Sequence, residues 1–199
     1  MNFNLYLEWS IFFMLIGFGL YTMKVIKNEK KQFLKEGVQI QFHHFQFLIP
    51  KWWTIVEQDR AQMIFKRTDT RYEWEAKLSL HVSSLTHSLE EIYKNEIEQR
   101  KIIFDLDTSV IYNPTDFNSL PIVQDGQYEM LRIKGTATQD RSERLYYDAF
   151  ILRDKASGDY LYAESKSSVL NGLIEGPYFE EMMKTTNKIP IAEGTNPRS

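Results

Sequence analysis

The chain has four histidines and no cysteine, so histidine is the residue best able to bind a metal ion or to transfer a proton near neutral pH. His43 and His44 are neighbours in the sequence. Adjacent residues of a strand point to opposite faces of a sheet, so these two imidazoles are poorly placed to share one ion. His81 and His87 lack the helical His spacing or acidic pair that would support a zinc site. We interpret the histidines as turn or sheet-edge residues and predict no metal site and no cofactor.

The sequence contains no recognisable motif for nucleophilic catalysis or phosphate binding. Serine, histidine and aspartate all occur, but no serine sits in a Gly-x-Ser-x-Gly elbow. Gly126 and Gly158 are isolated turn glycines and not parts of a phosphate-binding loop. We therefore assign no catalytic residue and expect a protein that is not an enzyme. The alternative is a hydrolase-like enzyme with an unrecognised site, which requires a deep pocket with converging His, Asp, Glu or Arg side chains.

Aromatic and arginine side chains are the residues best suited to binding, because Trp, Tyr and Arg dominate the energetics of protein interfaces. The candidates for contact with a partner are Trp52, Trp53, Arg132, Tyr146, Tyr160 and Tyr162. The alternative for the tyrosines is packing against flanking helices. Of the two tryptophans we expect one to be buried and one partly exposed, since neighbours on an extended segment face opposite ways.

An apolar segment at the N-terminus predicts a membrane anchor. Residues 11–23 carry no charge, and extension to residues 5–26 gives the roughly 20 residues that a helix needs to cross a bilayer. The helix is expected to continue to residue 36 and to stop at Gly37. The residues expected to face lipid are Trp9, Phe12, Phe13, Leu15, Ile16, Phe18, Leu20 and Tyr21.

Two other interpretations of this segment are weaker. A cleaved signal peptide would have a basic stretch before the apolar run and a small-residue cleavage site after it, and neither is present. A buried core helix fits poorly, because the segment is apolar all round and is followed by a lysine cluster. We therefore expect a single-pass membrane protein with the lipid bilayer as one partner.

Charge predicts the side of the membrane on which the domain lies. No Lys or Arg precedes the apolar run, and five lysines follow it: Lys24, Lys27, Lys30, Lys31 and Lys35. The positive-inside rule therefore favours a cytoplasmic domain, with an extracytoplasmic domain as the alternative. The rest of the chain holds the remaining 19 basic and 24 acidic residues, out of 24 and 27 in all. That acidic excess argues against nonspecific nucleic-acid binding, and we expect no nucleic-acid partner.

Beyond Gly37 the pattern indicates alternating strands and few helices. The predicted strands span 38–49, with a bulge or tight turn at His43 and His44, and 54–57, 62–67, 72–82, 109–112, 128–138, 144–153 and 160–166. Ser88-Leu-Glu-Glu predicts a helix that starts with a capping box, and its apolar stripe extends to Phe104. A final helix is expected from Pro177 to about residue 188, after a short helical turn at 169–174.

These elements predict an α+β domain. We expect an antiparallel sheet of about six strands with helices packed on one face, or on both as an α/β/α sandwich, behind the N-terminal transmembrane helix. The predicted organisation is an anchor and juxtamembrane helix at residues 1–37, a soluble domain at 38–188 and a disordered tail at 189–199.

The run Phe-Gln-Phe-Leu-Ile-Pro-Lys-Trp-Trp at residues 45–53 resembles the opening of the PsbP-like, or DcrB-like, superfamily. The later strand at Met63, the helix at Ser88, the meander and a final helix with Phe179 follow in a similar order. The sequence departs from the family in having no Gly before the tryptophan pair and in having a membrane helix where relatives are commonly exported or lipid-anchored.

The resemblance implies a noncatalytic accessory domain that binds or stabilises a larger assembly. It supplies no catalytic residue. We therefore expect a membrane-anchored binding or assembly module that acts through contacts with a protein partner. A small-ligand or lipid-binding domain with an apolar cavity is a further alternative.

Overall fold

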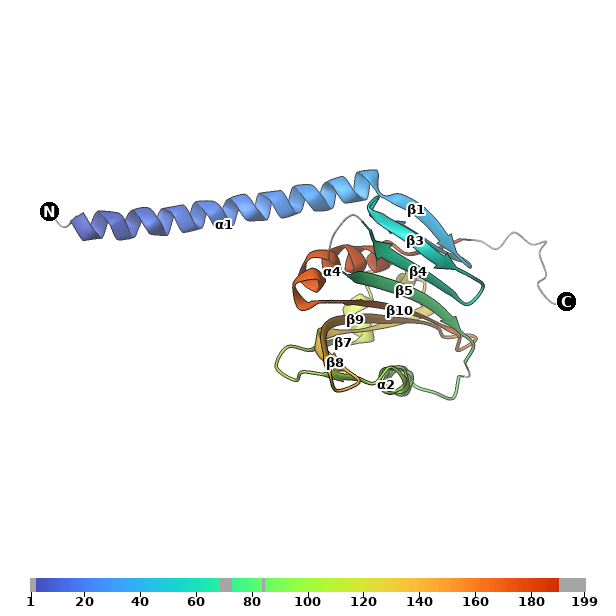
Figure 1. Cartoon of the computed structure of the whole chain (residues 1–199). Coiled ribbons are helices and arrows are strands. Elements are labelled where there is room, and N and C mark those ends of the chain that lie inside the picture. The colour runs from blue at the N-terminus through green and yellow to red at the C-terminus, as the bar shows by residue number, and fades with distance from the viewer. Residues whose placement is uncertain (1–2, 69–72, 84, 190–199) are drawn as a thin grey trace. The chain divides into compact units, whose positions relative to one another are not determined.

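The computed structural model describes residues 3–68, 73–83 and 85–189 of the chain. The chain divides into two compact units, Met1–Gly37 and Val38–Ser199. Figure 1 shows the first unit as one long helix and the second as sheets with helices packed on them.

The first unit is helix α1 (Phe3–Glu36), which is 34 residues long. The helix ends at Gly37, whose backbone N–H donates to the carbonyl of Phe33 at 2.8 Å. The segment Trp9–Glu36 is long and apolar enough to cross a membrane, judged by length and composition. The eight side chains expected to face lipid are all exposed: Trp9, Phe12, Phe13, Leu15, Ile16, Phe18, Leu20 and Tyr21.

The described part of the second unit is built on an antiparallel sheet of eight strands, more than the six expected. Its strands, in spatial order, are β3 (Trp53–Gln58), β4 (Gln62–Arg67), β5 (Trp74–His81), β10 (Tyr160–Ser167), β9 (Glu143–Asp154), β8 (Tyr128–Gln139) and β6 (Ile102–Phe104). The eighth strand, β7 (Val110–Tyr112), also pairs with β8. A small second sheet holds β1 (Val38–Phe42), β2 (Phe45–Ile49) and β11 (Asn187–Lys188).

The two adjacent histidines form the turn between β1 and β2. His43 has a φ of 54°, and Phe42 lies opposite Phe45 in the antiparallel register. The expected shift of the alternation at this point is therefore confirmed. The tight turn lets both phenylalanines face the same core, and both are buried.

Helix α2 (Leu89–Gln99) begins with the predicted capping box. The Ser88 hydroxyl accepts from the N–H of Glu91, and the Glu91 carboxylate accepts from the N–H of Ser88 at 2.8 Å. The inclusion of Phe104 in this helix was wrong. Lys101 has a φ of 53°, which ends the helix, and the chain continues as strand β6.

Helix α4 (Val169–Lys184) differs most from the expectation. The predicted start at Pro177 was wrong, because the short turn at 169–174 and the final helix are one continuous helix with Pro177 inside it. The predicted end near residue 188 was also wrong, since β11 follows and pairs with β2. Two short helices, η1 (Pro114–Phe117) and α3 (Pro121–Gln124), precede β8.

Side chains on the two faces of the large sheet belong to two separate cores. On β9, Phe150 and Leu152 pack with α3, α4, η1 and the small sheet, while Ala149 and Ile151 pack with α2. Helices therefore cover both faces of an antiparallel sheet, and the expected α+β class is confirmed. The predicted disordered tail lies outside the described residues except for Ile189, whose N–H donates to the carbonyl of His44 at 2.8 Å. Tyr72, the predicted first residue of β5, also lies outside them.

Candidate binding face on helix α4

Helix α4 exposes apolar side chains on its outer surface. Leu170, Leu173 and Ile174 are 73%, 63% and 54% exposed, and Pro177 is exposed as well. Their spacing of three, four and seven residues places them on one side of the helix. We call these four residues the α4 face. Its apolar character is unusual, since such a stripe normally faces a core.

The opposite side of α4 is packed in the protein interior. Phe179, Met182 and Met183 are fully buried in the core that includes Phe150. The rings of Phe150 and Phe179 meet edge to face, with centroids 5.7 Å apart. The helix is thus apolar on two sides, of which only one is covered by the described residues of the second unit.

A buried carboxylate fixes the middle of α4 to the sheet edge. Glu175 Oε2 accepts hydrogen bonds from the indole N–H of Trp53 at 2.8 Å and of Trp52 at 3.3 Å, and its other oxygen pairs with Arg67. Trp52 also meets the ring of Tyr178 edge to face at 5.1 Å. Glu175 therefore has a cation and two indole donors, as a buried charge requires.

A close backbone approach holds the first half of α4 against β9. A Cβ placed on Gly172 would lie 2.3 Å from Cγ of Tyr146, so any side chain there would overlap the ring. At Gly176 the nearest atom would be 3.8 Å away, which is an ordinary contact. Only Gly172 is required for the close packing of α4 on Tyr146.

An ion cluster anchors the second half of α4. Arg132 makes a bidentate contact with Asp148, at 2.9 and 2.7 Å, and a third contact with Glu180 at 2.7 Å. Burial raises the pKa of Asp148, opposed by the hydrogen bonds from Arg132. Burial would also raise the pKa of Glu180, but Lys184 and Arg132 outweigh it and hold that pKa at about 2.

A second polar network lies beneath α2. Tyr147 donates to Glu164 and shares a 2.9 Å hydrogen bond with Tyr162, while Arg100 Nε donates to Glu164 at 2.9 Å. Tyr160 donates to Glu96 of α2. Burial raises the pKa of Tyr147 and of Tyr162. This network fixes α2 to β9 and β10 and consists of satisfied interior groups.

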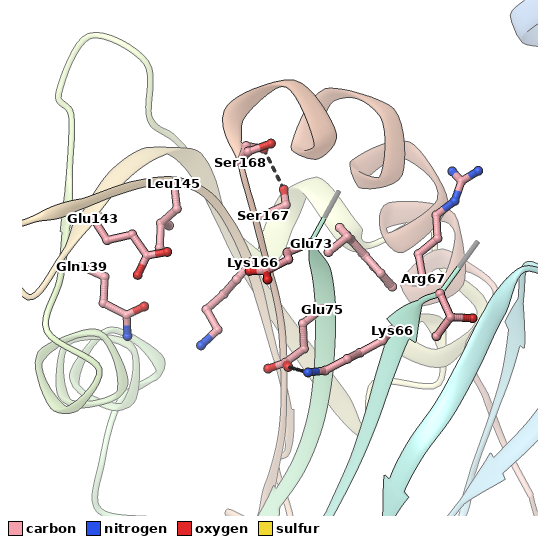
Figure 2. Close-up of a pocket in the computed structure, with 12 residues that line it drawn as sticks. Lys66, Arg67, Glu73, Glu75, Gln139, Glu143, Leu145, Lys166, Ser167 and Ser168 are labelled. Atoms are coloured by element: carbon pink, nitrogen blue, oxygen red, sulfur yellow. Dashed lines mark hydrogen bonds and ion pairs between the residues drawn. The ribbon is translucent and has the colours of Figure 1, made fainter. Parts of the chain in front are cut away.

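A hollow of about 470 Å³ lies beside the start of α4 (Figure 2). Its described lining carries charges of both signs, including Lys66, Glu73, Glu75, Glu143 and Lys166. The Lys66 ammonium and the Glu75 carboxylate form a 3.2 Å ion pair, drawn as a dashed line in Figure 2. The lining does not include Tyr147, Tyr162 or Asp148, whose pKa values burial raises.

Metal binding has no support in the part of the chain that the structure describes. Over residues 3–68, 73–83 and 85–189, no three His, Asp or Glu side chains come together as a metal site would need. His43 Nε2 instead lies 2.6 Å from the carbonyl of Arg60, and His81 stacks on the ring of Tyr160 at 4.9 Å.

The six residues proposed for partner contact fall into two groups according to how far they are buried. Trp53, Arg132 and Tyr162 are buried, so they do not offer a surface in this structure. Trp52, Tyr146 and Tyr160 are half-buried. The alternation argument for Trp52 and Trp53 is confirmed, with Trp53 inside and Trp52 partly exposed. Four of the six contact α4: Trp52 and Trp53 bind Glu175, Tyr146 packs on Gly172, and Arg132 pairs with Glu180. The other two, Tyr160 and Tyr162 of β10, lie beneath α2.

The α4 face was not predicted from the sequence. Its signal was present as apolar residues at positions 170, 173 and 174, but Pro177 broke the helical pattern in two. The missed partner of the tryptophan pair is Glu175, more than 120 residues away in the chain. A contact of that range leaves no local pattern.

No protein-family model matches the sequence. No curated protein matches it either.

The similarity to known proteins is one of fold. The solution structure of the cyanobacterial PsbP protein CyanoP from Synechocystis is similar with a TM-score of 0.50 and 9% identity, over 76% of this chain and 91% of that one. The Ran-binding protein Mog1p of Saccharomyces cerevisiae has a TM-score of 0.48 and 8% identity, over 77% and 96%. Protein PA94 of unknown function from Pseudomonas aeruginosa has a TM-score of 0.48 and 13% identity, over 78% and 99%. At 9% identity, the likeness to CyanoP supports a PsbP-like fold for the second unit.

Proposed function

We propose that this protein is a membrane-anchored, noncatalytic binding module whose protein partner contacts the α4 face. The observation that carries the proposal is the exposure of Leu170, Leu173 and Ile174 along one side of a helix that is otherwise firmly fixed. An apolar helix face that lies in water is stabilised by association with another apolar surface. The partner is expected to present a groove or a helix of aliphatic side chains.

The rigidity of α4 favours a binding role. Glu175, Gly172 and Glu180 fix the helix at three points along its length. A helix held in this way does not have to be ordered when a partner binds, so less free energy is spent on conformational entropy. The α4 face is therefore a preformed surface.

The anchor part of the proposal rests on α1. The segment Trp9–Glu36 has 28 residues and contains an 18-residue window with a mean hydropathy of 1.6, and its most apolar part exposes aromatic and aliphatic side chains. Residues 1–37 would serve as membrane anchor and juxtamembrane helix, and residues 38–188 as the binding domain. The lysines that follow the apolar run favour a cytoplasmic position for that domain.

The noncatalytic part of the proposal rests on the positions of three groups whose pKa values burial raises. Tyr147, Tyr162 and Asp148 are buried in satisfied networks. None of these three residues is among the described residues that line the charged hollow beside α4. A binding role accounts for the same residues as supports of α2 and α4.

Site-specific photocrosslinking tests the proposal in the full-length chain. A photoreactive benzoylphenylalanine replaces Leu173, and cells are irradiated before membranes are isolated. A defined protein adduct is expected at this position, and Ile174→Glu introduced in the same chain should abolish it. The matched control carries the photoreactive residue at Val82, which is 92% exposed and lies outside α4.

Two results would overturn the proposal. One is an adduct at Leu173 that consists only of lipid, which would assign the α4 face to the bilayer. The other is the same adduct from Leu173 and Val82, which would show that exposure alone determines labelling.

A further inference from the structure

A second surface lies on the other side of the large sheet, between α2 and the edge strand β6. It is a groove of about 550 Å³. Tyr93 and Ile97, four residues apart on α2, form one wall, and Ile102 and Ile103 of β6 form the other. The walls of the groove are therefore apolar.

Among the residues that the structure describes, strand β6 has one edge without a pairing strand. It pairs with β8 on one side and is the last strand of the sheet on the other. The N–H of Asp105 donates to the carbonyl of Thr136, and the N–H of Asp140 donates to the carbonyl of Lys101. In an antiparallel pair, residues alternate between hydrogen-bonded and non-hydrogen-bonded pairs. The two bonds show that residues 101 and 105 belong to hydrogen-bonded pairs, so Ile103, opposite Thr138, does as well.

The alternation leaves the backbone groups of Ile102 and Phe104 pointing away from β8. Each of these residues then presents an N–H and a C=O at the free edge, beside the apolar groove. A strand edge of this kind is a template for another strand. A small apolar molecule could fill the groove but could not satisfy this alternating set of donors and acceptors.

Exposed apolar side chains continue along the same edge. Ile103 is 53% exposed, and Leu106, in the loop to β7, is 93% exposed. On β7, which pairs with the same edge of β8, Val110 and Ile111 are 46% and 53% exposed. The exposed apolar side chains along this edge of β8 therefore extend beyond the groove.

The rim of the groove carries a small excess of positive charge. Lys94, Lys101 and Arg141 line it against Glu98 and Asp140. Lys101 and Asp140 neutralise each other across 2.7 Å. The remaining rim favours a ligand with acidic residues next to its apolar ones.

We propose that this groove binds an extended peptide segment of a partner, which adds as a strand to β6 and places an apolar side chain between Tyr93 and Ile97. The backbone of the peptide bonds to Ile102 and Phe104, and its acidic residues face Lys94 and Arg141. The site is independent of the α4 face.

Selection from a phage library of random twelve-residue peptides tests the proposal, with the full-length chain in lipid nanodiscs as the target. Enriched peptides are expected to alternate apolar and acidic residues. Ile103→Glu should weaken their binding at least tenfold, whereas Leu173→Glu and Val82→Glu should leave it unchanged. Ile103 is half exposed, so this variant is expected to fold normally.

Two further readouts do not depend on a protein variant. Methylation of alternate backbone nitrogens of an enriched peptide should abolish binding in one phase of the alternation and not in the other. The amide protons of Ile102 and Phe104 should exchange more slowly in the complex, with little change at Ile103. The proposal is overturned if no peptide is enriched over empty nanodiscs, if Ile103→Glu binds as well as the wild type, or if methylation leaves binding unchanged in both phases.

Discussion

The indole N–H of Trp53 donates a 2.8 Å hydrogen bond to the buried carboxylate of Glu175, which lies 122 positions later in the chain. Trp53 is in turn stacked on Trp74, with ring centroids 4.2 Å apart. This contact joins the edge strand β3 to the centre of α4. It is one of the three contacts that fix α4, together with those of Gly172 and Glu180.

Replacement of that carboxylate should destabilise the second unit. Glu175→Gln keeps the shape but removes the charge that neutralises Arg67, so we expect a loss of about 3 kcal/mol, as is typical for breaking a buried ion pair. Urea unfolding of the full-length protein in detergent micelles, followed by tryptophan fluorescence, measures the change. The control is Glu143→Gln at an exposed position, where a change within about 0.5 kcal/mol is expected. Equal stability of the two variants would contradict the role of Glu175.

The two glycines of α4 should respond to alanine in opposite directions. Gly172→Ala places a Cβ 2.3 Å from the ring of Tyr146, so α4 must move, and we expect a loss of about 2 kcal/mol or more. Gly176→Ala meets nothing closer than 3.8 Å and removes a flexible residue from a helix, so a gain of up to about 1 kcal/mol is expected. Thermal unfolding of both variants gives the comparison. If both substitutions changed the stability in the same direction, α4 would not be held as closely to Tyr146 as described.

The stability of the protein should fall in acid partly through Glu180. Its pKa in the folded state is about 2, below the usual value of 4.5, so the folded state binds this proton less readily than the unfolded state. The stabilisation is therefore complete above about pH 5 and is lost as the pH falls toward 2. Glu180→Gln should be less stable than the wild type at pH 7, and the difference should shrink toward zero near pH 2. A difference that stays constant with pH would contradict the ion cluster with Arg132 and Lys184.

The absence of cysteine allows a clean test of membrane orientation. Ser157→Cys places a single thiol in the exposed turn between β9 and β10. If the lysines after the apolar run set the orientation, a membrane-impermeant maleimide should label this thiol only after intact cells are lysed. Labelling of intact cells would place the domain outside the cytoplasm. Carbonate extraction of the membranes checks in parallel that the chain is integrally inserted.

Local signals allowed much of the fold to be predicted from the sequence. The capping box at Ser88 fixed the start of α2, because its two bonds involve residues only three positions apart. The strand alternation around His43 and His44 predicted the turn for the same reason. These features depend on neighbours in the chain, so the sequence pattern contains all of their causes.

The errors occurred where tertiary contacts decide the structure. Pro177 is a favoured first residue of a helix, but the contacts of Glu175 and Gly172 extend α4 on its N-terminal side. Phe104 fits the apolar period of α2, yet pairing of β6 with β8 draws it into the sheet. The exposure of the α4 face could not be predicted from its apolar pattern, because an exposed apolar stripe and a buried one look the same in a sequence.

Pro177 also gives the α4 face a polar feature. Proline has no N–H, so the carbonyl of Leu173 lacks the donor that residue 177 would otherwise supply in the helix. That oxygen belongs to one of the four residues of the apolar stripe. A partner that offers an N–H or O–H at this one point would gain a directional bond within a surface that otherwise attracts any apolar contact. The orientation of the bound partner, and its discrimination from other apolar surfaces, would then depend on the Leu173 carbonyl that the missing N–H of Pro177 leaves available.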